Sequence, residues 1–180
     1  MSYLKNWSVW LRGRQLPCTV EYRPPTMALR QANFLASDMD APQGIDDGLE
    51  AMTVSLKMTG TASELLFLGL NTRLTVREGY TEYGGGYTGV EDVIEGRVIR
   101  LEPDARPAMT RAETATTVTL NIAFYKRSVD GRERILLIPG QGIRRVNGID
   151  MLSLTSLMVL VSSTQADSGF ELIDFLSEGN

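Results

Sequence analysis

Residues 114–127, with the sequence TATTVTLNIAFYKR, decide the fold because apolar and polar side chains alternate along them. The apolar positions are Val118, Leu120, Ile122 and Phe124. The positions between them are small and mostly polar, namely Thr117, Thr119, Asn121 and Ala123. Successive side chains of a β-strand point to opposite faces, so this period of two places one face on a core and the other in water. The stretch therefore predicts a long, half-buried strand.

The same period recurs elsewhere and predicts a β-rich domain. Residues 47–59 place four apolar side chains on one face, namely Met52, Val54, Leu56 and Met58. Residues 90–101 alternate less cleanly, with Val90, Ile94 and Val98 opposed to Glu91, Glu95 and Arg97. Shorter strand candidates are residues 3–12, 17–31, 72–79 and 132–138. Pro24-Pro25 interrupts the second of these, and proline cannot donate to a central ladder, so that segment must bend or lie at an edge.

Turn residues mark the connections between these strands. Asp130-Gly131 separates two β-compatible runs and predicts a two-residue hairpin turn. Residues 79–89, GYTEYGGGYTG, predict a flexible hairpin loop because five glycines lie among three tyrosines. Residues 33–47 lack clear periodicity and predict a long loop between strands. Loops of this length in a compact domain are usually functional or mobile.

Two helices are also expected. Thr61 and Glu64 fit a capping box, which predicts a short helix over residues 65–68 that covers an open end of the sheet. Asp150 is placed to cap a second helix that runs to about Val161. The second helix is apolar around most of its girth, so it must be covered on most sides, which indicates burial against a neighbouring subunit. We therefore divide the chain into a β domain, residues 1–161, and an acidic C-terminal extension, residues 162–180.

The composition excludes several kinds of active site. The 180 residues carry a net charge of −4, contain no histidine and hold one cysteine, Cys18. No Ser-His-Asp relay, histidine metal ligand, intrachain disulfide or four-cysteine zinc site is therefore possible. Glu91, Asp92 and Glu95 offer carboxylates for acid–base chemistry or magnesium, but three acids on one exposed strand are typical of a solvated or pairing face. We predict no catalytic residue, metal, cofactor or membrane-spanning segment.

Four stretches, taken in order, resemble a known family. They are LKNWSVWLRGRQL at 4–16, APQGIDDGLEAMTVSLKMTG at 41–60, AFYKRSVDGRERILL at 123–137 and IRRVNGIDML at 143–152. On these stretches the chain resembles the major tail tube protein of contractile-tailed bacteriophages and of R-type tailocins. The Val-Asn-Gly-Ile-Asp run at 146–150 is the most specific local match. The loop at 79–89 departs from the family pattern, and the segment from about Ser162 has no counterpart in it.

The resemblance implies a structural protein and not an enzyme. It implies an antiparallel β-barrel or sandwich with one short flanking helix and a C-terminal helix. Six copies would form a ring with one continuous inner β-barrel, and rings would stack into a tube inside a contractile sheath. The lumen would hold the tape-measure protein and then conduct DNA. The expected location is the tail of a virion, assembled in the cytoplasm of the bacterial host.

The small polar faces of the long strands suit such a lumen, because basic side chains there would bind DNA phosphates. We predict that the lumen is lined by Thr53, Ser55, Thr117, Thr119 and Asn121, with Glu91 and Glu95 adding repulsive negative charge. The alternative places these faces outside, under the sheath. Lys57 and Arg97 lie on the same faces and fit the lumen only if carboxylates on neighbouring strands neutralise them.

Apolar side chains in exposed segments predict the contacts between subunits or rings. These residues are Phe34, Leu35 and Met39 in the expected loop, and Leu157 and Leu160 in the expected C-terminal helix. Two structural alternatives are the tube protein of a headless tailocin and that of a type VI secretion system. An alternative of another class is a small-ligand-binding β-barrel or an enzyme using carboxylates alone, which would need a concave pocket with convergent polar groups.

Overall fold

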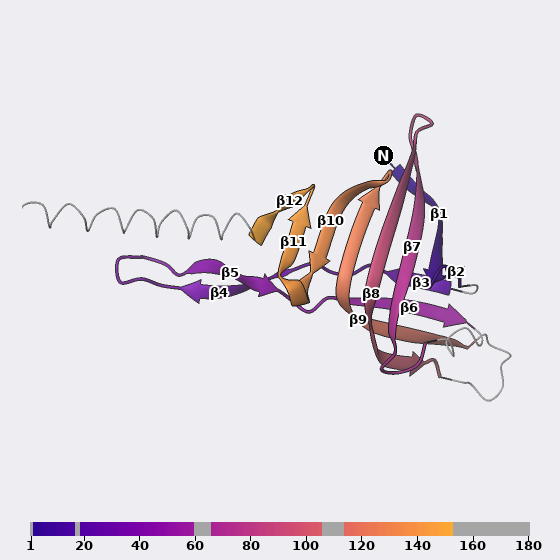
Figure 1. Ribbon diagram of the computed structural model, residues 1–180, viewed down its shortest axis with the longest axis horizontal. Coiled ribbons are helices and arrows are strands. Elements are labelled where there is room, and N and C mark those ends of the chain that lie inside the picture. The colour runs from indigo at the N-terminus through magenta and orange to yellow at the C-terminus, as the bar shows by residue number, and fades with distance from the viewer. Residues whose placement is uncertain (1, 17–18, 60–65, 106–113, 153–180) are drawn as a thin grey trace, which may run out of the picture.

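A computed structural model describes residues 2–16, 19–59, 66–105 and 114–152, and in these ranges twelve strands and one 3-10 turn occur (Figure 1). The strands are β1 (Ser2–Leu11), β2 (Arg14–Gln15), β3 (Thr19–Arg23), β4 (Leu29–Phe34), β5 (Gln43–Leu49), β6 (Thr53–Thr59), β7 (Asn71–Glu82), β8 (Tyr87–Pro103), β9 (Ala115–Val129), β10 (Arg132–Ile138), β11 (Ile143–Val146) and β12 (Ile149–Asp150). The 3-10 turn, Pro139–Gln141, joins β10 to β11. The predicted mainly β fold is confirmed.

Strand β9, the stretch from which the prediction began, organises the main sheet. The sheet has the order β12-β11-β10-β9-β8-β7-β1-β2, and all its pairs are antiparallel. One edge of β9 pairs with β8, and the two strands bend together (Figure 1). The other edge pairs first with β6, which continues to β3, and then with β10. The sheet therefore divides into two branches beyond β9.

The core lies where the β6 branch meets the long strands. It is formed by the predicted apolar faces of three strands, together with side chains of β1 and β7. The fully or almost fully buried members include Val9, Met52, Val54, Leu56, Met58, Leu74, Val76, Ile94, Val98, Val118, Leu120 and Ile122. Full burial of one such side chain stabilises the fold by about 1.5–3 kcal/mol. The alternation in the sequence thus identified most of the core.

The prediction that Phe124 shares the apolar face of β9 is wrong, because β9 contains a β-bulge before this residue. Glu95 lies opposite Phe124 but Gly96 lies opposite Ile122, so Ala123 is an extra residue on β9. An extra residue shifts the later side chains to the other face. Tyr125 is therefore fully buried in the core, whereas Phe124 is only half-buried.

The segment at 33–47 is not the long loop that was predicted. Strands β4 and β5 pair over Leu29–Phe34 and Gln43–Leu49 as a separate two-stranded sheet, here called the arm, with a turn at residues 35–42 (Figure 1). Most of its side chains are exposed on both faces, so no core imposed an alternation on the sequence. A strand without a buried face carries little periodic signal.

The remaining predictions have mixed outcomes. Pro24-Pro25 interrupts the predicted strand 17–31, because β3 ends at Arg23 and β4 begins at Leu29. The glycine-rich loop is shorter than predicted, because β7 extends to Glu82 and β8 begins at Tyr87. Asp150 accepts a hydrogen bond on Oδ1 from the Leu152 amide at 3.1 Å, and the chain is helical at 151–152. Leu157 and Leu160 of the predicted second helix lie outside the described residues, as do Thr61, Glu64 and the extension 162–180. The prediction of a short helix over 65–68 is wrong for residues 66–68, which are not helical; Leu66 is instead buried in the core.

Candidate functional site: a polar sheet face and an exposed arm

The strand register brings the predicted polar positions together. Thr53 lies opposite Asn121 and Ser55 opposite Thr119, while Thr117 lies opposite Lys57. Directly opposite residues of an antiparallel pair share one face of the sheet. Five predicted lumen residues therefore form one surface across β6 and β9, on the side away from Leu56 and Leu120.

Strand β8 adds charged residues to this surface, here called the polar face. Arg97 lies opposite Asn121, Arg100 opposite Thr119 and Glu102 opposite Thr117. Further along the strands, Glu95 lies opposite Phe124 and Glu91 opposite Ser128. The polar face is thus more highly charged than the small side chains of β6 and β9 suggested.

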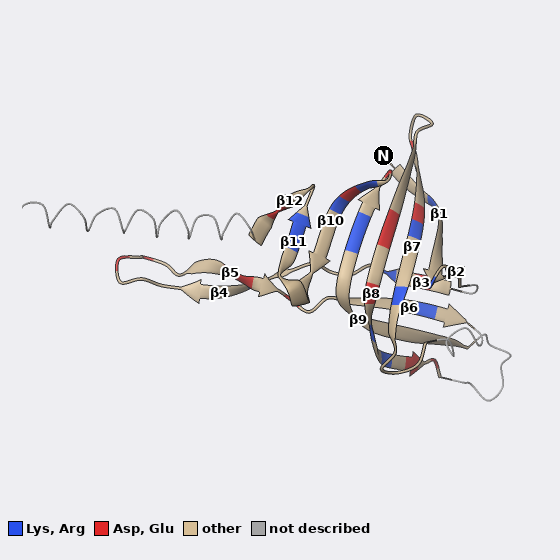
Figure 2. Cartoon of the chain, in the orientation of Figure 1, with Lys and Arg blue, Asp and Glu red and all other residues tan. Residues whose placement is uncertain are grey.

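Most of these charges have a partner of opposite sign close by. Arg77 Nε lies 2.8 Å from Glu91 Oε2, and Arg73 Nη1 lies 3.6 Å from Glu95 Oε1. Two further pairs are Lys57 Nζ–Asp104 Oδ2 at 2.9 Å and Arg100 Nη2–Glu102 Oε1 at 2.7 Å. Figure 2 shows red segments of β8 beside blue segments of β7. Glu91 and Glu95 add less net negative charge than predicted, because β7 supplies a counter-charge to each.

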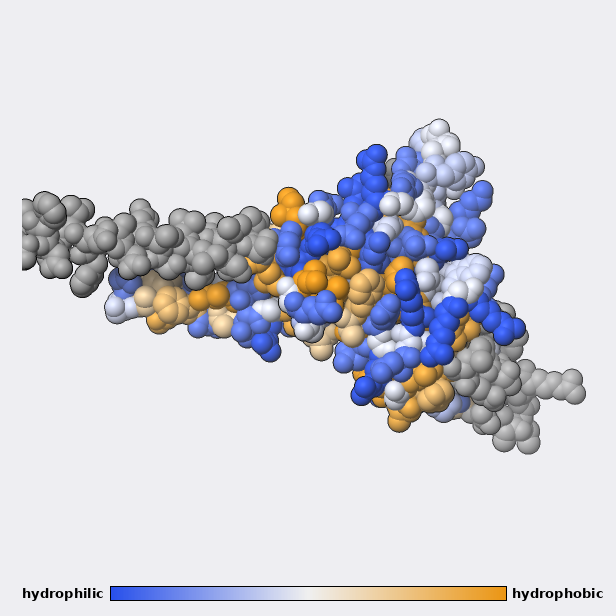
Figure 3. Space-filling view, in the orientation of Figure 1, coloured by the Kyte–Doolittle hydropathy of each residue, from blue (hydrophilic) through white to orange (hydrophobic). Residues whose placement is uncertain are grey.

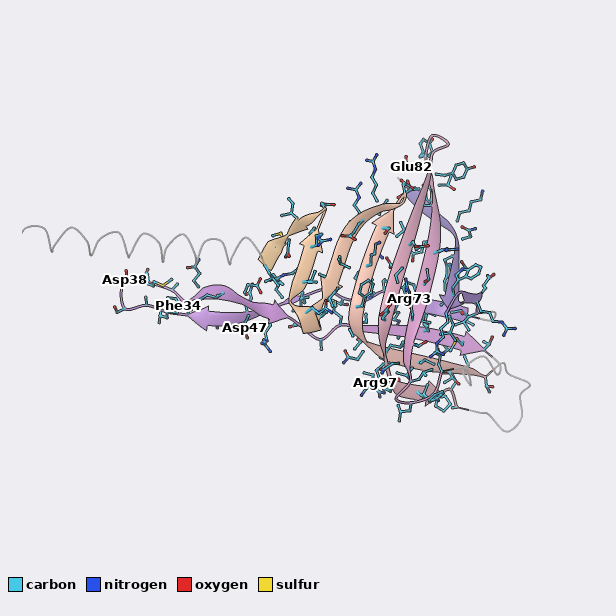
Figure 4. All side chains as sticks on the ribbon, in the orientation of Figure 1. Phe34, Asp38, Asp47, Arg73, Glu82 and Arg97 are labelled. Carbon is cyan, nitrogen blue, oxygen red and sulfur yellow. The ribbon has the colours of Figure 1, made fainter. Side chains whose placement is uncertain are left out.

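A concavity of about 840 Å³ at the bend of the sheet holds unbalanced positive charge. Its wall includes Arg12, Arg73 and Arg97, with Glu95 as its acidic residue. Arg97 Nε donates to Asn71 Oδ1 at 3.1 Å, and Arg12 Nη2 donates to the Asn71 carbonyl oxygen at 3.3 Å. Arg73 and Arg97 lie towards the lower part of the upright strands (Figure 4). Sequence reasoning missed this cluster, because three segments far apart in the chain form it.

Asp92 lies in the core and not on the exposed face with Glu91 and Glu95, which corrects the prediction. Consecutive residues of a strand point to opposite sides, and Asp92 is only 1 % exposed. Arg127 donates to both its carboxylate oxygens, from Nε and Nη2, each at 2.7 Å. The Tyr22 hydroxyl donates to Asp92 Oδ2 at 3.2 Å. Strands β3, β8 and β9 are thereby joined by one buried polar cluster.

The surroundings of this cluster favour neutral tyrosine hydroxyls and a charged Arg127. Burial raises the pKa of the Tyr22 hydroxyl above its ordinary value, and the charge of Asp92 raises it further. Burial, followed by the charge of Asp92, also raises the pKa of Tyr125. Hydrogen bonds to Asp92 raise the pKa of the Arg127 guanidinium.

The raised pKa of Tyr22 predicts a loss of stability in alkali. The folded protein holds this proton more tightly than the unfolded chain, so the stabilisation is complete below the unfolded tyrosine pKa of about 10 and is lost above it. Above that pH, Tyr22→Phe should reduce the fall in unfolding free energy by up to about 1.4 kcal/mol per pH unit. Urea titrations at several pH values measure this slope. Tyr83→Phe, on the exposed β7–β8 turn, is the control, and equal slopes for both variants would contradict the prediction.

The arm exposes apolar side chains at its far end. Phe34 is 51 % exposed and Leu35 is 61 % exposed. Ile45 lies opposite Ala32, so it shares a face with Phe34. Met39 is less exposed, and its sulfur accepts a hydrogen bond from the Ala36 amide at 3.4 Å. Figure 3 shows apolar surface along the arm, and Figure 4 shows Asp38 at its far end with Phe34 nearby.

An apolar groove of about 440 Å³, here called the root groove, lies at the base of the arm. Its apolar lining comes from the arm and the segment that precedes β4, from β10 and β11, and from the chain after β12: Met27, Leu29, Leu49, Ile135, Leu137, Val146 and Met151. Arg144 Nη2 lies 2.6 Å from Asp46 Oδ2 and joins β11 to β5. This hydrogen bond, followed by one from the Gly48 amide, lowers the pKa of Asp46.

Across the described ranges there is no cluster of three or more potential metal-ligating side chains. No helix in the described part of the chain is long and apolar enough to cross a membrane. The chemistry of the described surface is therefore that of ion pairs, small polar groups and exposed apolar side chains.

Comparisons with known proteins agree with this description. The family model described as phage tail tube protein FII matches residues 1–155. One similar structure is a chain of the PVC sheath–tube complex, an extracellular contractile injection system in its extended state, with a TM-score of 0.52 and 10% sequence identity. The match covers 68% of this chain and 87% of that chain. A chain of the PVC sheath/tube terminator has a TM-score of 0.53 at 8% identity, covering 69% and 94%. A chain of the cap that terminates the anti-feeding prophage tube has a TM-score of 0.50 at 10% identity, covering 69% and 87%. No curated protein sequence matches the chain.

Proposed function

Because the chain belongs to the phage tail tube protein FII family, it is a tube subunit of a phage or phage-like tail, and we propose that six copies close into each ring of the tube. In each ring, the long strands of six subunits join into one continuous inner β-barrel. Rings stack inside a contractile sheath. The resulting tube holds the tape-measure protein and then conducts DNA through the bacterial envelope.

The lengths and edges of the strands support the ring. Strands β7, β8 and β9 have 12, 17 and 15 residues, which is long for a domain of this size. An open sheet leaves unpaired backbone groups at its edges, and closure into a barrel removes them. Strands β2 and β12 lie at the two ends of the main sheet and present such edges.

The observation that carries the conduit proposal is the register of the polar face. Thr53, Ser55, Thr117, Thr119 and Asn121 share this face, and it is the side of the long strands that turns away from the core. Small hydroxyl and amide groups keep a channel hydrated, and they do not bind DNA phosphates as basic side chains do. Most charges on the face are paired, which lowers its net attraction for DNA. We propose that the polar face lines the lumen, with Arg12, Arg73 and Arg97 as its most basic positions.

Electron microscopy of the purified protein tests this function. We expect hollow rods or rings, and a helical reconstruction should place Thr119 and Asn121 on the inner wall. Their position on the outer surface would overturn the lumen assignment and leave the tube intact. A protein that stays monomeric at high concentration would contradict the ring and favour a ligand-binding domain.

A further inference from the structure

The concavity at the bend of the sheet, here called the bend concavity, has a positive charge that its own residues leave unbalanced. Its wall contains Arg12, Arg73 and Arg97, and its acidic side chain is Glu95. Glu95 is paired with Arg73, whose Nη1 atom lies 3.6 Å from Glu95 Oε1. Within the described ranges, neither Arg12 nor Arg97 has an acidic partner, and both are exposed. An anion is therefore the ligand that this charge favours.

Neutral hydrogen bonds hold these two arginines in place. The Arg12 amide donates to the Arg73 carbonyl oxygen at 3.2 Å, and Arg12 Nη2 donates to the Asn71 carbonyl oxygen at 3.3 Å. Arg97 Nε donates to Asn71 Oδ1 at 3.1 Å. Both guanidinium groups thus converge on Asn71, and a guanidinium has several further N–H donors. Donors that are positioned before binding lower the entropy cost of holding a ligand.

The bend concavity belongs to the polar face. Arg97 lies opposite Asn121, which is also in the wall, and Arg73 lies opposite Glu95. Elsewhere on this face, ion pairs of 2.7–2.9 Å cancel charges of either sign. A hollow lined by one sign of charge concentrates ions of the opposite sign. The bend concavity is therefore the part of the polar face most attractive to anions.

The size of the bend concavity favours a run of phosphates over one small anion. Its volume of about 840 Å³ lies within the range of about 300–1,000 Å³ that is typical of ligand sites, and it exceeds the needs of one phosphate group. Guanidinium groups bind phosphate oxygens through paired hydrogen bonds. Arginines spread around one hollow can contact successive phosphates of a nucleic-acid strand, which repeats its charge every few ångströms.

We propose that the bend concavity binds phosphate groups, and that the backbone of DNA in the lumen supplies them. The site rests on the proposed tube, since it is there that DNA meets the polar face. Arg12 and Arg97 bind the phosphate oxygens, whereas Glu95 repels them and weakens the site. In a closed ring the contact recurs in each subunit as a basic belt. Such contacts do not depend on base sequence, so they pass from one phosphate to the next as the DNA moves.

Fluorescence anisotropy of a short labelled DNA duplex, titrated with the full-length protein, tests the site. Arg12→Gln and Arg97→Gln should each weaken binding at least about tenfold, because each removes charged hydrogen bonds to phosphate. Each should also reduce the steepness of log K against log salt by about 0.9 between about 50 and 200 mM salt, as expected for one lost phosphate contact. Arg132→Gln is the matched control, because Arg132 is also exposed but belongs to β10, outside the bend concavity. Its affinity and salt dependence should match those of the parent protein.

A gain of binding separates the site from damage to the fold. Glu95→Gln removes the acid from the wall and should strengthen DNA binding about fivefold, the effect of one unit charge a few ångströms away in water. Asp47→Asn removes an exposed acid that pairs with Arg30 on the arm, and it should leave the affinity unchanged. A damaged fold would not bind DNA more tightly. Equal affinities for the Glu95→Gln and Asp47→Asn proteins would contradict the role of the concavity.

Two further probes, inorganic phosphate and a polyglutamate peptide, identify the source of the anion. Calorimetry that detects binding of inorganic phosphate dependent on Arg97, without any binding of DNA, would keep the phosphate site and overturn DNA as its source. A preference for polyglutamate over DNA would overturn the proposal in favour of an acidic protein segment. Equal losses in the Arg97→Gln and Arg132→Gln proteins would overturn it as well, because the binding would then have no defined location.

Microscopy of the same samples separates this site from the proposed assembly. Tubes whose phosphate binding does not depend on Arg12 and Arg97 refute the site alone. An absence of rings and tubes refutes the proposed assembly, and with it DNA in a lumen as the source of the phosphates.

Discussion

Asp92→Asn should lower the free energy of unfolding by about 3–5 kcal/mol, because it leaves the partly buried Arg127 guanidinium without the charge of its buried partner. Arg127 makes two hydrogen bonds of 2.7 Å to this carboxylate, and Tyr22 makes a third of 3.2 Å. The neutral amide keeps the shape of the side chain but removes its charge. Thermal unfolding should show a decrease in Tm of about 6–20 °C for a chain of this size.

The neighbouring residue provides a matched control for Asp92. Glu91 also pairs with an arginine, Arg77, but both side chains are about half exposed to water. Exposed pairs contribute about 0–1 kcal/mol, so Glu91→Gln should have a small effect. If the two variants lost the same stability, the buried cluster would not be the anchor between β3, β8 and β9 that its geometry indicates.

Gly96→Ala should destabilise the fold by about 1–3 kcal/mol or more, because a side chain at this position has no space. A Cβ atom on Gly96 would overlap the carbonyl oxygen of Asn121 and would also lie close to the Ile122 backbone. Backbone atoms cannot rotate away as a flexible side chain can. The strands β8 and β9 would therefore have to separate where they bend.

Gly140→Ala is the control for the loss of a glycine. Nothing lies within 4 Å of a Cβ at Gly140, which is in the 3-10 turn between β10 and β11. Urea unfolding should give Gly140→Ala nearly the stability of the parent protein and Gly96→Ala a clearly lower midpoint. Equal midpoints would show that the bend tolerates a side chain and that the close approach is not required.

The two sites lie on either side of one structural feature. Asp92 and Gly96 are four residues apart on β8, and the bulge at Ala123 lies across from them on β9. The ion pair holds the two strands together on one side of the bulge, and the glycine allows close approach on the other. We expect that the polar face keeps its register through this bend, and that Thr119 and Asn121 depend on it for their placement.

The sequence was informative where a strand has one buried face. The alternation of Met52, Val54, Leu56 and Met58, and of Val118, Leu120 and Ile122, reports burial directly, since burial selects apolar side chains at every second position. It was uninformative for the arm, whose residues are largely exposed on both faces, and misleading at Phe124, where a bulge shifts the period. No local pattern marks a bulge in advance.

By itself, the sequence determined the β-rich class, most of the core, the absence of histidine chemistry and the resemblance to tail tube proteins. It did so because composition and the alternation of apolar side chains within one strand can be read from short stretches of the chain. Only the tertiary structure decided that Asp92 is buried with Arg127, that Arg12, Arg73 and Arg97 share a concavity, and that an apolar arm end and an apolar groove occur in one chain. These features join residues far apart in the sequence, and the distance between such residues is set by strand register and sheet curvature, which no short stretch of the chain contains.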